Sequence, residues 1–345
     1  MIFEAGINSS ILRALKNKAG NMDPLDKYCV LLFDEIQIKS ELSYETNQQR
    51  VCGYQDLGQL GRSLSVANRA LVFMIRGLNT PWKELIAYYF CGQDMSSTHL
   101  KKIIIEIILD LQHVGLNVVA TVCKQLTKYQ EPLRELCDIG SQGSVYFLVG
   151  DKPIVTIFNV PDLLKRTRDV FVDYNLQFEV GKMAKFEHIQ MLLDLDKKKH
   201  FKTLPKLKTE HFNLNDINIK ENVEVAAMQF SSTVAAGLET LVLTKYAPHD
   251  VTYTAEFVSV MDDLFDSLNG NQLNMLENKK YRGVLMAMSS HMKFWSWLLV
   301  HLVNWKVIDK KTGKDETSSF DFIKGWQITI EAVMFLWGNL QGGRI

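Results

Sequence analysis

The sequence has no excess of basic residues. Its 345 residues include 39 Lys plus Arg and 39 Asp plus Glu, so the formal net charge at pH 7 is zero. Proteins that bind a long nucleic-acid duplex through its phosphates usually have an excess of positive charge. The chain is therefore expected either to bind nucleic acid weakly or to lack the part that binds it.

Cysteine is scarce, and its spacing does not indicate a metal site. The five cysteines form no Cys-x-x-Cys pair, and no histidine cluster completes a zinc set. Four of them lie in or beside apolar runs, where a free thiol packs as a small hydrophobe, and this usage favours a reducing compartment. A signal peptide is not seen at Met1–Gly6, and the apolar runs are interrupted short of a membrane-spanning length. These absences predict an intracellular protein that has no membrane partner.

The stretch Tyr28–Lys39 is the clearest functional feature of the sequence. Five apolar or aromatic residues lead into Asp34, and apolar residues then alternate with polar ones, which predicts a buried strand that carries a carboxylate. Because side chains alternate along a strand, Asp34 and Glu35 are expected on opposite faces. A buried carboxylate needs a partner, and Mg²⁺ prefers such oxygens. The alternative interpretation is a structural acid that is hydrogen-bonded to a turn.

The first 160 residues alternate strand and helix patterns. Three strand-like runs, 28–39, 51–58 and 70–77, follow one another and predict an antiparallel meander, with Pro81 and Trp82 closing the turn beyond.

A helix at 96–113 follows, with apolar residues spaced three and four apart. Strands at 116–123 and 153–158 flank a helix at 127–136. This order is typical of an RNase H-like fold.

The middle of the chain has a different pattern. Residues 162–174, 183–193, 220–246 and 254–268 all show helical periodicity, so the portion reads as all-helical. The change places a boundary near residue 160.

An ordered series of motifs resembles the P-element transposase family, which includes the THAP-domain transposase-like proteins. The series covers nearly the whole chain, although no single motif in it is specific. The motifs are Leu31–Glu35 with Ile38–Lys39, Gly53–Gly58, Ala70–Gly77, Trp82–Lys83, Tyr88–Phe90, Val160–Lys165, Pro205–Leu207, Val225–Ala235, Thr254–Phe257, Phe265–Asn269, Gly325–Ile330 and Leu336–Trp337.

The resemblance implies an α/β chain with an RNase H-like mixed sheet interrupted by an all-helical insertion domain that binds GTP. It divides the chain into an RNase H-like catalytic-core portion at 1–160, the insertion at 161–280 and an incomplete return to the core at 281–345. Family members cut and join DNA with two divalent metal ions, which clamp the attacking and leaving oxygens. Mg²⁺, GTP and DNA transposon ends are therefore the implied cofactors and partner.

The resemblance gives an incomplete catalytic set. Asp34 corresponds to the first metal-binding Asp, but Lys124 stands where the second is expected. The third acid belongs to a helix beyond Trp337, and it is absent from the 345 residues. An ammonium group cannot ligate a cation, and losing one carboxylate usually ruins such a site. No strand transfer is expected from this polypeptide.

More of the positions expected to contact a guanine nucleotide are present than of the catalytic positions. The resemblance carries the family contacts onto Lys206, Val223, Phe265, Asp266 and Asn269. No P-loop is present, and another family contact lies in the absent helix. Weak or absent GTP binding is therefore expected.

Three functional hypotheses follow. The first is a nuclear derivative or fragment of a P-element-type transposase, without the zinc-binding THAP domain, which binds nucleic acid or nucleotide or assembles with itself or an intact transposase. The second is an active transposase whose chain is incomplete here. The third is a host-recruited protein-interaction module.

Overall fold

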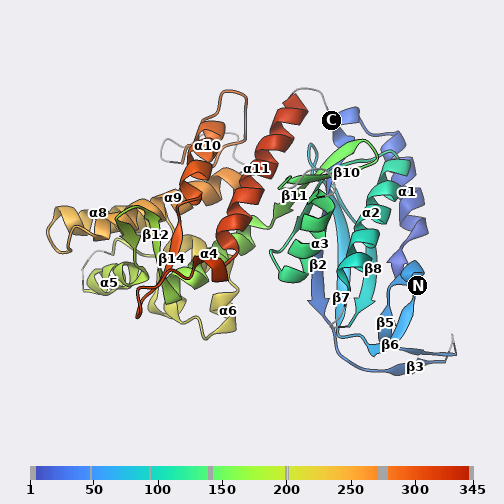
Figure 1. Ribbon diagram of the computed structural model, residues 1–345, viewed down its shortest axis with the longest axis horizontal. Helices are drawn as coiled ribbons and strands as arrows, with labels where there is room; N and C mark the ends of the chain where they lie inside the picture. The colour runs from blue at the N-terminus through green and yellow to red at the C-terminus, as the bar shows by residue number, and fades with distance from the viewer. Residues whose placement is uncertain are drawn as a thin grey trace. The chain divides into compact units, whose positions relative to one another are not determined.

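The computed structural model describes residues 5–46, 49–92, 95–138, 143–198, 200, 202–270 and 279–341. The chain folds into two compact units (Figure 1). Unit 1 contains Met1–Phe158 and Glu331–Ile345, and unit 2 contains Asn159–Ile330.

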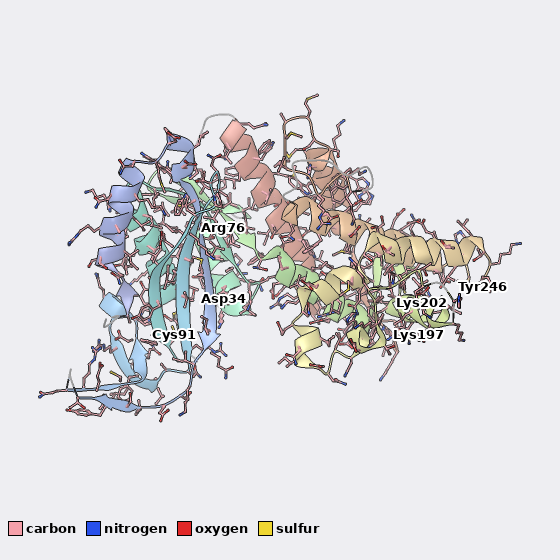
Figure 2. The ribbon with its side chains drawn as sticks, turned by 180° about the vertical axis from the view of Figure 1, so that it is seen from behind. Asp34, Arg76, Cys91, Lys197, Lys202 and Tyr246 are labelled. Carbon is pink, nitrogen blue, oxygen red and sulfur yellow. The ribbon has the colours of Figure 1, made fainter. Side chains whose placement is uncertain are left out.

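Unit 1 is built on a mixed sheet. Its strand order is β10-β11-β9-β2-β7-β8-β5-β6, with β1 also paired to β8. The central strand β2 runs antiparallel to β7 and parallel to β9, as the predicted mixed sheet requires. The strands are β1 (Gly6–Ile7), β2 (Tyr28–Gln37), β5 (Tyr54–Asp56), β6 (Arg62–Val66), β7 (Arg69–Gly77), β8 (Lys83–Cys91), β9 (Asn117–Cys123), β10 (Tyr146–Val149) and β11 (Lys152–Phe158). Asp34, Arg76 and Cys91 mark β2, β7 and β8 in Figure 2.

The antiparallel meander exists, but one predicted strand was misplaced. Its third member is β8, whereas the 51–58 run breaks into β4 (Arg50–Cys52) and β5. Gly53 separates these two with φ +105°, a conformation that favours glycine, and a Cβ there would lie 2.1 Å from the Glu41 carbonyl oxygen. Strand β4 pairs instead with β3 (Ser43–Glu45). The turn at Pro81 was placed correctly, and the chain passes from it directly into β8.

Helices cover both faces of the sheet in unit 1. Alternation along β2 sends Phe33 toward Tyr129 of α3, with ring centroids 5.2 Å apart. Val30 lies in a second cluster with Val119, Val155 and the α11 residues Ala332 and Leu336. The helices of this unit are α1 (Ser9–Gly20), α2 (Ser97–His113), α3 (Thr127–Asp138) and the last part of α11 (Phe322–Gln341).

Unit 2 is mainly helical, with an aromatic core. Phe171 packs on Phe257 with ring centroids 5.1 Å apart, and both side chains are fully buried. The helices are α4 (Val160–Asp173), α5 (Phe186–Lys197), α6 (Ile217–Lys220), α7 (Val223–Gln229), α8 (Ser232–Leu243), α9 (Val251–Asn269), α10 (His291–Leu302) and the first part of α11. Short 3-10 turns lie at Pro24–Lys27, Gly58–Leu60, Thr209–Phe212 and Thr317–Ser319.

The prediction of an all-helical insertion needs a correction. Unit 2 contains a three-stranded sheet of β12 (Tyr174–Glu179), β13 (Lys182–Ala184) and β14 (Lys306–Asp309), in the order β13-β12-β14. Tyr174 pairs with Asp309, far away in the sequence. These strands are short, and a pairing over such a distance leaves no local periodic signal.

One helical stretch meets the length and composition of a membrane span, contrary to the expectation from the apolar runs. It covers Val223–Leu243, and 44% of its window is buried. The stretch is two helices, because α7 ends before Ser231 caps α8 through its side chain. Its inward residues, including Ala226 and Leu238, belong to the buried core, which is the pattern of a core helix.

Candidate functional site

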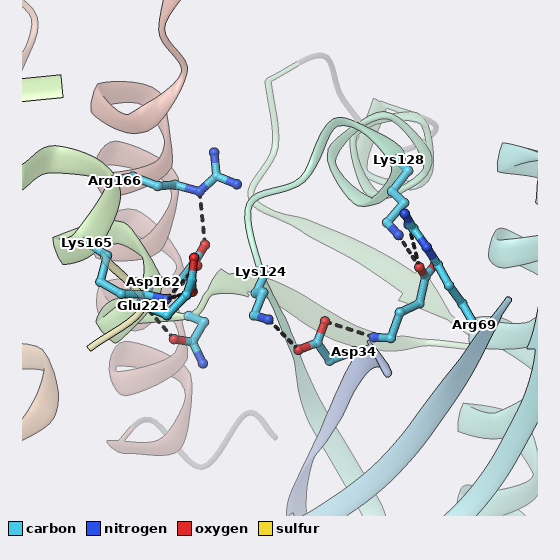
Figure 3. A network of polar contacts seen from close by, with 10 residues as sticks. Asp34, Arg69, Lys124, Lys128, Asp162, Lys165, Arg166 and Glu221 are labelled. Atoms are coloured by element: carbon cyan, nitrogen blue, oxygen red, sulfur yellow. Dashed lines mark hydrogen bonds and ion pairs between the residues drawn. The ribbon is translucent and has the colours of Figure 1, made fainter. Parts of the chain in front are cut away.

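Asp34 lies near the end of β2 and forms an ion pair with Lys124. Lys124 directly follows β9, the parallel neighbour of β2, so both residues come to the same edge of the sheet. The Lys124 ammonium lies 2.9 Å from Asp34 Oδ2. Figure 3 shows the two side chains pointing toward each other. The Glu35 backbone N–H donates to Asp34 Oδ1 at 2.8 Å. Both charged side chains are more than 40% exposed, so the pair adds only about 0–1 kcal/mol to stability.

Glu35 belongs to a separate cluster. Its carboxylate is only 9% exposed and accepts from Arg69 Nη1 at 3.0 Å and from the Lys128 ammonium of α3 (Figure 3). Burial, together with the charges of Glu35 and Asp34, raises the pKa of the neighbouring Tyr129 hydroxyl well above its usual range. This cluster was not predicted from the sequence, although Arg69 and Lys128 were visible there as two possible cationic partners.

The donor set around Asp34 does not fit a divalent metal ion. Mg²⁺ needs several oxygen ligands in near-octahedral geometry, usually from carboxylates and water. Here a cationic side chain contacts Asp34 on one carboxylate oxygen. Among the residues that the structure describes, no group of three or more His, Cys, Asp and Glu side chains could hold a metal ion.

Unit 2 contains a cavity of about 670 Å³. It brings together three of the five residues proposed for nucleotide binding: Lys206, Phe265 and Asp266. Lys206 lies on an exposed loop, whereas the other two project from α9. The lining residues are Thr203, Leu204, Pro205, Lys206, Leu207, Glu224, Ala227, Met228, Ser231, Ser232, Thr233, Val234, Asp262, Phe265, Asp266, Lys279 and Arg282.

The loop wall of this cavity is held by a buried acid. Asp196 of α5 accepts from the Thr203 N–H at 2.8 Å, from the Leu204 N–H at 3.1 Å and from the Thr203 hydroxyl. These bonds satisfy a carboxylate that is only 2% exposed. They fix the loop that carries Lys206.

Val223 and Asn269 are not part of the cavity lining. Val223 is the first residue of α7, whose N-cap Asn222 accepts from the Glu224 N–H at 2.8 Å. The next residue, Glu224, does line the cavity. Asn269 is the exposed last residue of α9.

The structure adds four charged residues that were not predicted from the sequence: Glu224, Asp262, Lys279 and Arg282. Asp262 and Asp266 lie one turn apart on α9, and Lys279 is paired with both of them. Burial works to lower the pKa of Lys279, but its contacts with the two carboxylates raise it overall. The spacing of the two acids was visible in the sequence, whereas their partner was not.

Asp263, beside these acids, gives unit 2 a pH-dependent stability. Burial raises its pKa from an ordinary value to about 6, and neighbouring Asp262 adds to the effect. Since the folded pKa lies above the unfolded value, the stabilising contribution is present below about pH 4 and is lost as the pH rises through about 6.

Asp263→Asn is therefore expected to raise the free energy of unfolding at pH 7 by about 1–2 kcal/mol, a figure that allows for partial exposure. At pH 4 the gain should be close to zero. Urea unfolding at both pH values tests this, with the exposed Asp194→Asn as the control. An equal gain at both pH values would show a packing effect and not a titration.

Comparison with known proteins yields two domain matches. Residues 3–136 match the TNP-like, RNase H N-terminal domain, and residues 162–281 match the TNP-like, GTP-binding insertion domain.

Two curated proteins are similar over most of this chain. Transposable element P transposase of Drosophila melanogaster is 28% identical over 249 residues, which is 72% of this chain and 31% of that protein. DNA transposase THAP9 of Homo sapiens is 24% identical over 277 residues, which is 76% of this chain and 30% of that protein. The chain thus spans just under a third of the length of either relative.

A solved structure of the Drosophila P element transposase strand transfer complex is similar to 99% of this chain and 71% of that chain. The TM-score is 0.81 at 22% sequence identity. The likeness confirms the predicted fold class, an RNase H-like mixed sheet interrupted by an insertion.

Proposed function

The chain belongs to the P-element transposase family, and from this premise we propose that it is a derivative that does not carry out metal-dependent strand transfer. The observation that supports the proposal is the 2.9 Å ion pair between Lys124 and Asp34. In the family pattern a second carboxylate stands at position 124, so the ammonium removes a ligand and adds a charge that repels a cation.

A DNA-cleavage assay tests the proposal. The chain is incubated with transposon-end DNA and Mg²⁺ or Mn²⁺, with the family's C-terminal acidic helix fused to it. We expect no nicking above the background without metal. Metal-dependent nicking with Lys124 intact would contradict the proposal and favour an active transposase represented by an incomplete chain.

The proposed role is nuclear and non-catalytic, with DNA as the partner. The relatives that support it are a P transposase and a DNA transposase. Such a derivative would act in a complex with a second copy of itself or with an intact transposase. The rival proposal, a host-recruited interaction module, requires capture of a protein partner in the absence of DNA.

A second proposed function is guanine-nucleotide binding in the unit 2 cavity. Its support is the domain match and the placement of Lys206, Phe265 and Asp266 around one cavity large enough for a nucleotide. Lys206 would meet a phosphate as a point charge, and Asp266 would accept hydrogen bonds from the base.

Asp266→Ala is expected to lower GTP affinity by about tenfold or more while leaving ATP affinity unchanged, because a charged hydrogen-bond acceptor is lost. Calorimetry with the two nucleotides measures this, and the exposed Asp194→Ala serves as the control. A preference for GTP that survives the substitution would remove Asp266 from the site.

A further inference from the structure

We propose that Lys279 is an internal competitor for the base-recognising carboxylate of the unit 2 cavity, so that a guanine nucleotide has to displace its ammonium group to bind. The inference rests on the proposed guanine-nucleotide function and assigns the residue that limits affinity and selectivity at that site. Lys279 thus weakens the binding of guanine selectively.

The geometry puts Lys279 on the atom that the base would use. Lys279 Nζ lies 3.0 Å from Asp266 Oδ2 and also contacts Asp262 Oδ2. The two acid side chains are 13% exposed and the lysine side chain is 22% exposed. All three residues line the same cavity. The ion pair is therefore inside the cavity and shielded from solvent.

Partial burial makes this contact stronger than a surface ion pair. Charges in a shielded site interact through a lower effective dielectric and are screened less by salt. The Lys124–Asp34 pair of unit 1 is about three times more exposed on its carboxylate side, 43% against 13%. The attraction between Lys279 and Asp266 is therefore screened less than that between Lys124 and Asp34, although the hydrogen bond of Lys279 goes to Asp262 Oδ2.

Guanine and the lysine ammonium compete because both are donors. The N1–H and 2-amino groups of guanine point along the edge that a carboxylate recognises, and a carboxylate accepts such bonds on its two oxygens. The positive charge of Lys279 Nζ already faces Oδ2 at 3.0 Å, while its hydrogen bond goes to Asp262 Oδ2. Adenine lacks this pair of donors, so the competition costs GTP affinity and leaves ATP affinity unaffected.

The test is equilibrium binding of GTP and ATP by calorimetry to the full chain and to five variants: three single lysine variants, Asp266→Asn, and the double variant Lys279→Met with Asp266→Asn. Lys279→Met removes the charge while keeping the length of the side chain, and Lys279→Arg keeps the charge. Lys280→Met is the matched control, because its ammonium lies over the Tyr281 ring, 4.5 Å from the centroid.

We expect Lys279→Met to bind GTP about tenfold more tightly than the natural chain, with ATP affinity unchanged. Lys279→Arg and Lys280→Met should bind GTP as the natural chain does. In the double variant Lys279→Met with Asp266→Asn, the gain should disappear.

Two results would overturn the inference in distinguishable ways. Unchanged or weaker GTP binding in Lys279→Met, with binding lost in Asp266→Asn, would make Lys279 a structural or phosphate-contacting residue and leave the nucleotide site standing. No GTP binding in any variant would reject the guanine-nucleotide function and this inference with it.

A second measurement uses only the natural chain, so its result does not depend on whether a variant folds. Acylation of the natural chain with an amine-reactive reagent, followed by mass spectrometry, reports the accessibility of each lysine. Saturating GTP should increase labelling of Lys279 severalfold, because the base takes over Asp266, while labelling of Lys280 stays constant. Equal or lower labelling of Lys279 in the presence of GTP would contradict displacement.

Discussion

Lys124→Asp is expected to create divalent-cation binding beside Asp34. The substitution replaces a repelling ammonium with a second carboxylate at the same edge of the sheet. Oxygen ligands are what Mg²⁺ and Mn²⁺ prefer, so affinity for Mn²⁺ should rise by at least tenfold, about 1.4 kcal/mol or more. Calorimetric titration with Mn²⁺ measures this directly. In a chain fused to the family's C-terminal acidic helix, the same substitution should yield metal-dependent DNA cleavage.

Two control variants separate ligand gain from other effects. Lys124→Asn removes the ammonium and introduces a neutral carboxamide in place of a carboxylate. This variant should bind Mn²⁺ far more weakly than Lys124→Asp. Lys128→Asp adds an acid to the opposite face, beside Glu35, and should not support cleavage. Since the Lys124–Asp34 pair is largely exposed, the two Lys124 variants should stay folded. Equal Mn²⁺ binding in Lys124→Asp and Lys128→Asp would show nonspecific attraction.

Trp326→Ala is expected to cause the largest loss of stability in unit 2. Trp326 is fully buried in α11, and its indole N–H donates to Thr167 Oγ1 of α4 at 2.9 Å. Removing the ring leaves a cavity and a buried hydroxyl without its donor, which together cost about 3–5 kcal/mol. Thermal unfolding followed by near-UV circular dichroism should show a drop in Tm of roughly 10 °C or more.

The control is another tryptophan on a neighbouring helix. Trp297 of α10 is 44% exposed, so Trp297→Ala should cost no more than about 1 kcal/mol. A loss equal to that of Trp326→Ala would mean that the ring of Trp297 is buried, contrary to the structure. If Trp326→Ala left Tm unchanged, α11 would not pack on α4 as described.

Much of the fold could be predicted because its signals are local. The helical spacing of the apolar residues in α2 and its N-cap Ser96 can both be recognised from residues that are close together in the sequence. The structure confirms that helix. The order of strands and helices in unit 1 then restricts the topology, which the fold comparison confirms. Strand β8 was not predicted, and its alternation is broken where Ile86 and Ala87 are both buried at a shift in the pairing with β7.

The parts that could not be predicted depend on contacts between distant residues. Strands β12 and β14 pair Tyr174 with Asp309, and no property of either segment alone indicates this. The two sites show the same contrast. The meeting of Lys124 and Asp34 follows from parallel strands that end at one edge. The pairing of Lys279 with Asp266 joins a helix to a residue outside any helix or strand, and only the structure reveals it.

In each unit, a lysine of the chain forms an ion pair with an aspartate that, by the family resemblance, would bind a ligand: Lys124 with Asp34, and Lys279 with Asp266. For the first of these, the most direct measurement is anomalous diffraction from crystals of the natural chain grown with Mn²⁺. No Mn²⁺ peak is expected within bonding distance of Asp34, and the Lys124 ammonium should still lie beside the carboxylate. A well-occupied Mn²⁺ on Asp34, with Lys124 displaced and another carboxylate completing the site, would contradict it.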